Sequence, residues 1–216
     1  MDIRILETHM QQLTERYPDL EVCTSDLLKA FQLCANTFHS AGKMLLCGNG
    51  GSAADCDHIV GELMKGFLSK RPVPLSFRGS LVQQWDQLDG GYIADRLQQA
   101  LPAISLANHS ALLTAYANDV EPEMIFAQQV YGYGKKGDVL VALTTSGNSA
   151  NVLRAVQTAK AIGMSTIGLT GKHGGQLKKL CDVTITVPWD STPDIQERHL
   201  PIYHSLCLLL EREFFG

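Results

Sequence analysis

A few side chains in two helix-like stretches have the chemistry to move protons or to bind a metal ion. In CGNGGSAADCDHIVGE, His58 and Glu62 stand four residues apart, so on a helix they share one face. The stretch DIQERHLPIYH adds a second set: Gln196, Glu197, His199 and His204. Histidine changes charge near neutral pH and a carboxylate can accept a proton, so both sets suit acid–base chemistry. Solvent-exposed helix faces carry such residues too, and the pattern alone leaves both interpretations open.

Two loops rich in glycine and hydroxyl groups are candidates for binding a phosphate. The first contains Asn49, Gly50, Gly51 and Ser52, and the second contains Thr144, Thr145, Ser146 and Ser149. Glycine lets the backbone approach a ligand, and a following helix presents free N–H groups and a positive dipole end to an anion. Neither loop carries the Gly-Lys-Ser/Thr of a nucleoside-triphosphate site, which indicates small phosphorylated metabolites. Ordinary strand-to-helix turns with capping serines are the alternative for either loop alone.

The first loop also matches the dinucleotide fingerprint GxGxx(G/A), at Gly48, Gly50 and Ala53. That fingerprint expects an acidic residue about 20 positions further on to hold the ribose. The stretch GFLSKRP at 66–72 supplies no acid. We therefore expect no nucleotide cofactor.

Short apolar runs that alternate with helical stretches predict the sheet that positions these loops. The predicted strands are 43–47, 102–107, 138–143, 164–170 and 182–188. Helical periodicity follows each glycine loop, at 53–67 and in ANVLRAVQTAKAIG. Strands that alternate with helices imply a parallel sheet covered on both faces. The sequence therefore predicts an α/β fold with a doubly wound sheet of about five strands.

Helices are also predicted at both ends of the chain. Residues 2–17 and 24–41 show helical spacing, with a start at Thr24-Ser25-Asp26 and a stop at Gly42, and form an N-terminal helical arm over 1–41. The last helix is expected over about 193–214, with Thr192 as the N-cap and Pro193 at the first helical position.

The stretch between the first loop's helix and the second strand is long for a connection in a compact domain. It runs over 71–101, is expected to hold a short helix at 91–100 and contains Trp85. We interpret it as a lid or an interface arm, an insertion at about 73–100 in a single domain spanning 1–216.

The composition limits the class of protein. Of the 216 residues, 45% are hydrophobic and 19% are charged, which favours one globular domain over a disordered chain. A net charge of −4 argues against broad nucleic-acid binding. No apolar run approaches the roughly 20 residues of a membrane span, and MDIRILETHMQQLTERY lacks the apolar core of a signal peptide. We expect a cytoplasmic protein whose six cysteines are reduced and packed as small hydrophobic residues.

Taken in order, the motifs resemble the sugar isomerase (SIS) superfamily and, within it, the phosphoheptose isomerases. The resemblance rests on CGNGGSAAD, the HxxxE pair, TTSGNSANV, LTGKHGG and the IQExH stretch, and it covers the chain except about 73–100. It implies conversion of sedoheptulose 7-phosphate to D-glycero-D-manno-heptose 7-phosphate, for a bacterial surface polysaccharide. The first loop would contact the substrate and the second its phosphate, with Thr144 standing where some relatives have serine. An Asn-Asp pair, here Asn118 and Asp119, would also line the site.

The resemblance further implies a zinc site in some members, at His58, Glu62, Gln196 and His204. An aldose–ketose isomerisation needs a base beside the carbonyl and a group that moves protons between the two oxygens. We assign Glu62 as the base and His204 as the acid. A zinc ion would polarise the carbonyl, but a Glu62 bound to zinc is less free to act as a base.

Gln196 and His204 are eight residues apart, which is about 12 Å along a helix, so one ion is hard for both to reach. A kink at Pro201 would help. Otherwise part of the site comes from a neighbouring subunit. The family's members are homotetramers with active sites at subunit interfaces. We therefore expect a homotetramer in which the N-terminal helices pack between subunits.

Two alternatives stay open. A non-catalytic SIS protein that binds the replication initiator would share the fold and the loops, but it lacks the His/Glu pair that this chain retains at His58 and Glu62. An isomerase for a pentose or hexose phosphate is the other alternative, and the insertion keeps it open.

Overall fold

The five predicted strands form one parallel sheet in the computed structural model, which describes residues 3–216. The strands are β1 (Met44–Cys47), β2 (Ala103–Ser105), β3 (Val139–Leu143), β4 (Ser165–Thr170) and β5 (Val183–Thr186). Their order is β2-β1-β3-β4-β5, and β1 and β3 are neighbours with Leu46 opposite Val141. The predicted doubly wound α/β fold is confirmed.

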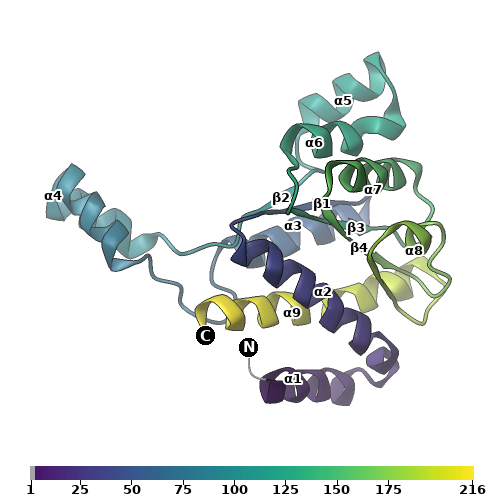
Figure 1. The fold of residues 1–216 in the computed structure, drawn as a ribbon, viewed down its shortest axis with the longest axis horizontal. Helices are drawn as coiled ribbons and strands as arrows, with labels where there is room; N and C mark the ends of the chain where they lie inside the picture. The colour runs from purple at the N-terminus through teal and green to yellow at the C-terminus, as the bar shows by residue number, and fades with distance from the viewer. Residues whose placement is uncertain (1–2) are drawn as a thin grey trace.

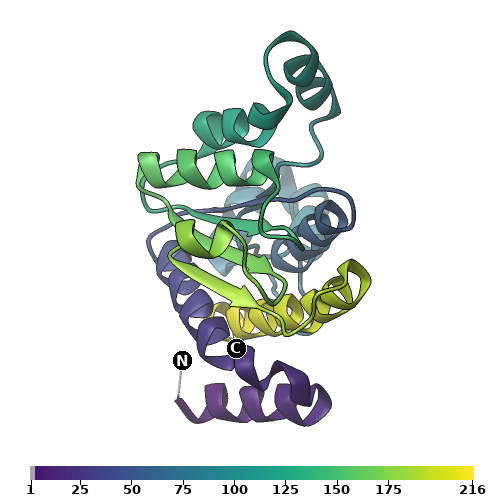
Figure 2. The ribbon, with the colours of Figure 1, turned by 90° about the vertical axis from the view of Figure 1, so that its right-hand side faces the viewer.

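Helices cover both faces of this sheet (Figures 1 and 2). The helices are α1 (Ile3–Arg16), α2 (Thr24–His39), α3 (Gly51–Met64), α4 (Leu75–Arg96), α5 (Ser110–Asp119), α6 (Ile125–Tyr133), α7 (Ala150–Ile162), α8 (Leu177–Leu180) and α9 (Thr192–Phe215), with 3₁₀ turns at Pro18–Cys23 and Pro122–Met124. Successive strand residues point to opposite faces. Leu46 and Val141 therefore pack with α2, α3 and α9, whereas Leu45 and Leu140 pack with α6 and α7. Both faces being covered explains why β1 and β3 are apolar throughout.

Two predicted helix ends need correction. Helix α2 ends at His39, and the left-handed residue behind it is Ala41, with φ of 56°. Gly42 is required for a different reason, because a Cβ there would lie 3.0 Å from the carbonyl oxygen of Gly137. At the start of α9 the N-cap is Ser191, whose hydroxyl accepts from the Asp194 N–H, so Thr192 is the first helical residue.

The insertion is more helical than predicted. The expected short helix at 91–100 is wrong, because α4 begins at Leu75 and ends at Arg96. Asp86 breaks it with φ of 74°, and a Cβ on Gly90 would lie 2.3 Å from the Leu81 carbonyl oxygen. The two halves of α4 therefore fold back on each other as a helical hairpin. This hairpin projects away from the sheet on two extended connections (Figure 1).

The predictions of reduced cysteines and of no membrane span can be compared with the structure. All six cysteines are free, and five of them are buried. Burial raises the pKa of the Cys34 thiol to about 12, so this group stays an unreactive thiol. Over residues 3–216, no helix is both long enough and apolar enough to cross a membrane.

Candidate active site

The two glycine loops meet in one pocket at the carboxyl ends of β1 and β3. Because these strands are parallel neighbours, the loops that leave them lie side by side. The pocket has a volume of about 320 Å³ and is lined by Asn49, Gly50, Gly51, Ser52, Leu143, Thr144, Thr145, Ser149, Thr192 and Gln196. Of the predicted second-loop residues, Ser146 is not in this lining. Its hydroxyl instead accepts from the Asn148 N–H at 3.1 Å.

Two glycines, Gly50 and Gly51, shape the first loop in different ways. Gly50 adopts φ of 58° as the N-cap of α3, a conformation that favours glycine. At Gly51 a Cβ would lie 2.3 Å from Nε2 of Gln196, so a larger residue there would displace the Gln196 side chain from its present position. Asn49 exchanges two hydrogen bonds of 2.9 Å with Asn151, which ties the loop to α7.

The second loop holds its hydroxyl groups in place through bonds among themselves. Thr144 Oγ1 lies 2.8 Å from Ser149 Oγ and 3.5 Å from Ser146 Oγ, and Thr145 Oγ1 lies 3.5 Å from Thr192 Oγ1. Of these residues, Thr144, Thr145, Ser149 and Thr192 line the pocket, so their hydroxyl groups are held in place before any ligand arrives. A phosphate would therefore find donors already oriented, at little cost in side-chain ordering.

The electrostatics of the pocket come from helix ends, since no Lys or Arg side chain among residues 3–216 lines it. Helices α3, α7 and α9 all begin there, at Gly51, Ala150 and Thr192. Each helix N-terminus presents unpaired N–H groups and a positive dipole end, worth about half an elementary charge. Three such ends aimed at one pocket are suited to a dianionic phosphate group.

The predicted acid–base residues gather further along α3 and α9. His58 Nε2 lies 3.3 Å from Glu62 Oε1, and the rings of His58 and His204 are 5.0 Å apart, edge to face. The Glu62 side chain is only 12% exposed. Burial lowers the pKa of His204, and the charge of His58 lowers it further against the opposing effect of Glu62. His204 is therefore neutral at pH 7, with one ring nitrogen able to donate and the other able to accept.

A hydrogen-bond chain behind His58 was not foreseen. The Tyr203 hydroxyl lies 3.1 Å from Asp55 Oδ1 and 3.1 Å from His58 Nδ1. When the hydroxyl donates to Asp55, it accepts from Nδ1–H of His58, whose other ring nitrogen, Nε2, is the one that lies 3.3 Å from Glu62 Oε1. Asp55 stands one helical turn before His58 and Tyr203 stands next to His204, but nothing in the sequence marked them as partners.

Replacing Tyr203 by phenylalanine is expected to lower kcat about 10- to 100-fold, the usual cost of losing a partner that orients a functional histidine. The phenylalanine ring would still fill the space of the tyrosine ring, so the melting temperature should stay close to that of the unmodified protein. Steady-state kinetics with thermal melts test this. A kcat equal to that of the unmodified protein would show that the chain through Tyr203 does not orient His58.

Of the four predicted metal ligands, His58, Glu62 and His204 lie together, and Gln196 does not join them. Among residues 3–216, no three His, Cys, Asp or Glu side chains are placed to hold a metal ion. Among the described residues, the buried Nε2 of His204 has no hydrogen-bond partner, so this nitrogen is available to bind a ligand. Gln196, however, lies against Gly51 at the other end of the site. The four ligands do not fit a shared ion in this arrangement, so the proton transfers are assigned to side chains alone.

The remaining predicted pair, Asn118 and Asp119, lies apart from the pocket. Both residues are exposed at the C-terminal end of α5 and bonded to each other at 2.8 Å. Helix α5 stands on the far side of α6 from α9 (Figure 1). Within one chain these side chains do not reach the pocket.

Comparisons with known proteins agree on one group of enzymes. The family model described as SIS domain matches residues 87–171. A phosphoheptose isomerase from Nitratiruptor is 43% identical over 84% of this chain and 83% of that protein. One from Akkermansia muciniphila is 34% identical over 94% of both chains. A solved phosphoheptose isomerase from Neisseria gonorrhoeae superposes with a TM-score of 0.73 at 30% identity, covering 97% of this chain and 98% of the other.

Proposed function

Because this chain belongs to the phosphoheptose isomerase family of SIS-fold enzymes, we propose that it converts sedoheptulose 7-phosphate to D-glycero-D-manno-heptose 7-phosphate. The product would supply a bacterial surface polysaccharide, either lipopolysaccharide or capsule. The observation that carries the proposal is the meeting of the N-termini of α3, α7 and α9 at one pocket. Further along α3 and α9 lies the cluster of His58, Glu62 and His204. A regulator of the replication-initiator-binding type is not favoured, because the relatives are isomerases by name and the His/Glu pair is retained.

The proton transfers follow from the positions of Glu62 and His204. Glu62 takes a proton from C1 of the ketose, next to the C2 carbonyl, and returns it to C2 of the enediol(ate). His204, neutral and holding one N–H, gives a proton to the C2 oxygen and accepts the proton of the C1 hydroxyl. The C2 carbonyl becomes a secondary alcohol and C1 becomes the aldehyde, with no net gain or loss of protons.

The distance between pocket and base favours a long, open-chain sugar phosphate. Ser52 and Glu62 are ten residues apart on α3, which is about 15 Å along the axis. The Glu62 side chain leans back toward the pocket, since helix side chains tilt toward the N-terminus. With its phosphate in the pocket, an extended heptulose brings C1 nearer to this carboxylate than a pentulose or hexulose does. We expect kcat/KM to be highest for sedoheptulose 7-phosphate among ketose phosphates of five to seven carbons. Higher values for a shorter sugar would move the assignment to that substrate.

Zinc binding is a separate proposal. When bound, the ion would polarise the C2 carbonyl, and His58, Glu62, Gln196 and His204 are the candidate ligands. Their separation means that binding needs a rearrangement of α9 or a group from another subunit. Calorimetric zinc titration should show stoichiometric binding that is lost in His58→Ala. Unchanged binding in this variant would place the metal elsewhere.

We also infer one SIS domain over 1–216, with α1 and α2 as an N-terminal arm and α4 as the insertion, assembled as a homotetramer in the cytoplasm. Two features support assembly: the hairpin α4 exposes Trp85 and Leu88, and Asn118 and Asp119 do not line the pocket formed by the two glycine loops of their own chain. The free cysteines suit a reducing compartment, which cell fractionation tests.

In light scattering, the mass should be four times the 23.6 kDa of the chain. Removal of the N-terminal arm should reduce the number of subunits per particle, because the helices of the arm are proposed to pack between subunits. A monomeric mass for the full chain would contradict the tetramer.

A further inference from the structure

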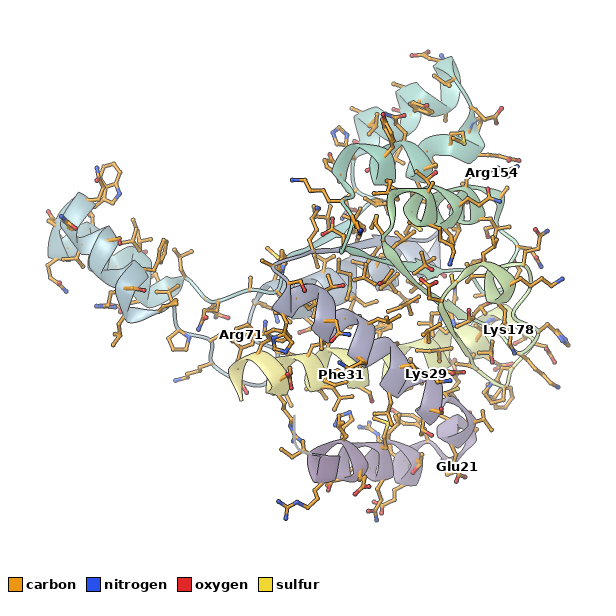
Figure 3. The ribbon with its side chains drawn as sticks, viewed as in Figure 1. Glu21, Lys29, Phe31, Arg71, Arg154 and Lys178 are labelled. Carbon is orange, nitrogen blue, oxygen red and sulfur yellow. The ribbon has the colours of Figure 1, made fainter. Side chains whose placement is uncertain are left out.

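A buried ion pair lies directly behind the proposed base. Arg71, in the connection after α3, has a side chain that is 0% exposed, and its partner Glu211 near the end of α9 is 2% exposed. Arg71 Nε donates to Glu211 Oε1 at 2.9 Å, and Nη2 lies 2.8 Å from the same oxygen. Figure 3 shows Arg71 where the connections of α4 meet the C-terminal part of α9.

The guanidinium of Arg71 also caps the helix that carries Glu62. Its Nη1 donates to the Leu63 carbonyl at 2.8 Å, and its Nη2 donates to the Glu62 carbonyl at 3.2 Å. These carbonyls belong to the last turn of α3, which has no further helix residues to bond them. Arg71 therefore fixes the backbone of the turn from which the Glu62 carboxylate projects.

The carboxylate of Glu211 fixes the segment that follows. It accepts from the N–H groups of Phe67, Leu68 and Ser69 at 2.8, 2.9 and 3.2 Å. Burial alone would raise the pKa of Glu211, but these N–H groups and Arg71 lower it, so the group stays ionised. The segment is thereby held in one conformation at the end of α3.

This segment touches the proposed acid as well. The ring of Phe67 packs 5.3 Å from the ring of His204. The single pair Arg71–Glu211 is thus connected by backbone bonds to Glu62 on one side and through Phe67 to His204 on the other.

Stability alone gives little reason to bury these charges. A buried ion pair is often no more stabilising than apolar residues of similar volume. The planar fork of arginine can bond two carbonyls and a carboxylate at once, which apolar residues and lysine cannot do.

We propose that Arg71 and Glu211 are positioning residues for the isomerisation, setting the placement of Glu62 relative to His204. This inference rests on the proposed role of Glu62 as the base. Neither residue is part of the pocket lining, so we expect substrate binding not to depend on them directly.

The test compares Arg71→Lys and Glu211→Gln with the unmodified enzyme, using sedoheptulose 7-phosphate at a temperature where each protein is folded by circular dichroism. Arg71→Lys keeps the charge but loses the fork. We expect kcat to fall about 10²-fold, the cost of misplacing a reacting group by about 1 Å, while KM stays nearly unchanged. Glu211→Gln, which keeps the size of the side chain, decides the question if the lysine variant does not fold.

Asp138→Asn is the matched control. It removes a different ion pair, the partly buried Lys43–Asp138, where β3 begins and away from the pocket at the carboxyl ends of the strands. It should lower the melting temperature but leave kcat unchanged. Folded Arg71→Lys and Glu211→Gln with the kcat of the unmodified enzyme would overturn the positioning role.

Glu62→Gln, assayed alongside, separates this inference from its premise. If Glu62→Gln is inactive and Arg71→Lys is fully active, the positioning role of Arg71 is refuted, and the role of Glu62 as the base stands. A fully active Glu62→Gln refutes the base, and the positioning of that base with it.

Discussion

Replacing Glu62 by glutamine is expected to lower kcat for sedoheptulose 7-phosphate by about 10²- to 10⁴-fold, the usual contribution of a general base. The amide keeps the shape of the carboxylate but cannot accept the C1 proton. Because the side chain is 12% exposed, water is poorly placed to replace it as the base. Steady-state kinetics, with folding checked by circular dichroism, measure the effect.

Glu197→Gln is the control for the loss of a carboxylate. Glu197 lies on α9 near the pocket, but its side chain is 71% exposed and its nearest charged partner is Arg198 at 3.9 Å. Its kcat should stay close to that of the unmodified enzyme. Equal turnover by Glu62→Gln and Glu197→Gln would remove Glu62 from the reaction.

Removing the phosphate from the substrate is expected to have the second large effect. Sedoheptulose should react with kcat/KM at least about 10³-fold below that of its 7-phosphate, since a hydrogen bond to a charged group contributes about 1.5–3 kcal/mol and several are lost. Part of the loss should fall on kcat, because phosphate binding positions the distant C1.

Inorganic phosphate provides the matching control for the pocket. It should inhibit competitively against sedoheptulose 7-phosphate, because it occupies the space where α3, α7 and α9 begin. Similar kcat/KM values for the phosphorylated and unphosphorylated sugars would show that this pocket does not bind the phosphate.

The sheet could be predicted from the sequence because its strands are buried on both faces. A run such as that of β3 is apolar throughout and ends at a glycine-containing loop, a pattern few helices share. The parallel order then placed both loops at one edge of the sheet.

The insertion could not be predicted in the same way. Helix α4 lacks a continuous apolar face, because the break at Asp86 divides it and most of its apolar side chains are exposed. Helices α5 and α6 give no clear signal in the sequence either. They are short, and no side chain of α5 is buried to mark one face.

The site was predictable where one stretch of sequence holds the interacting residues. His58 and Glu62 share a helix face, and their side chains lie 3.3 Å apart. The contacts of Tyr203 with Asp55, and of Arg71 with Glu211, depend on how α9 packs against α3 and its following loop. Such contacts join residues more than a hundred positions apart, so sequence periodicity gives no signal for them.

The most direct test of the isomerase assignment is to incubate the purified protein with sedoheptulose 7-phosphate and follow the products by NMR. We expect an aldoheptose 7-phosphate whose aldehyde or hemiacetal signal grows as the ketose declines to equilibrium. No aldoheptose phosphate, with folded protein and zinc supplied, would contradict this assignment.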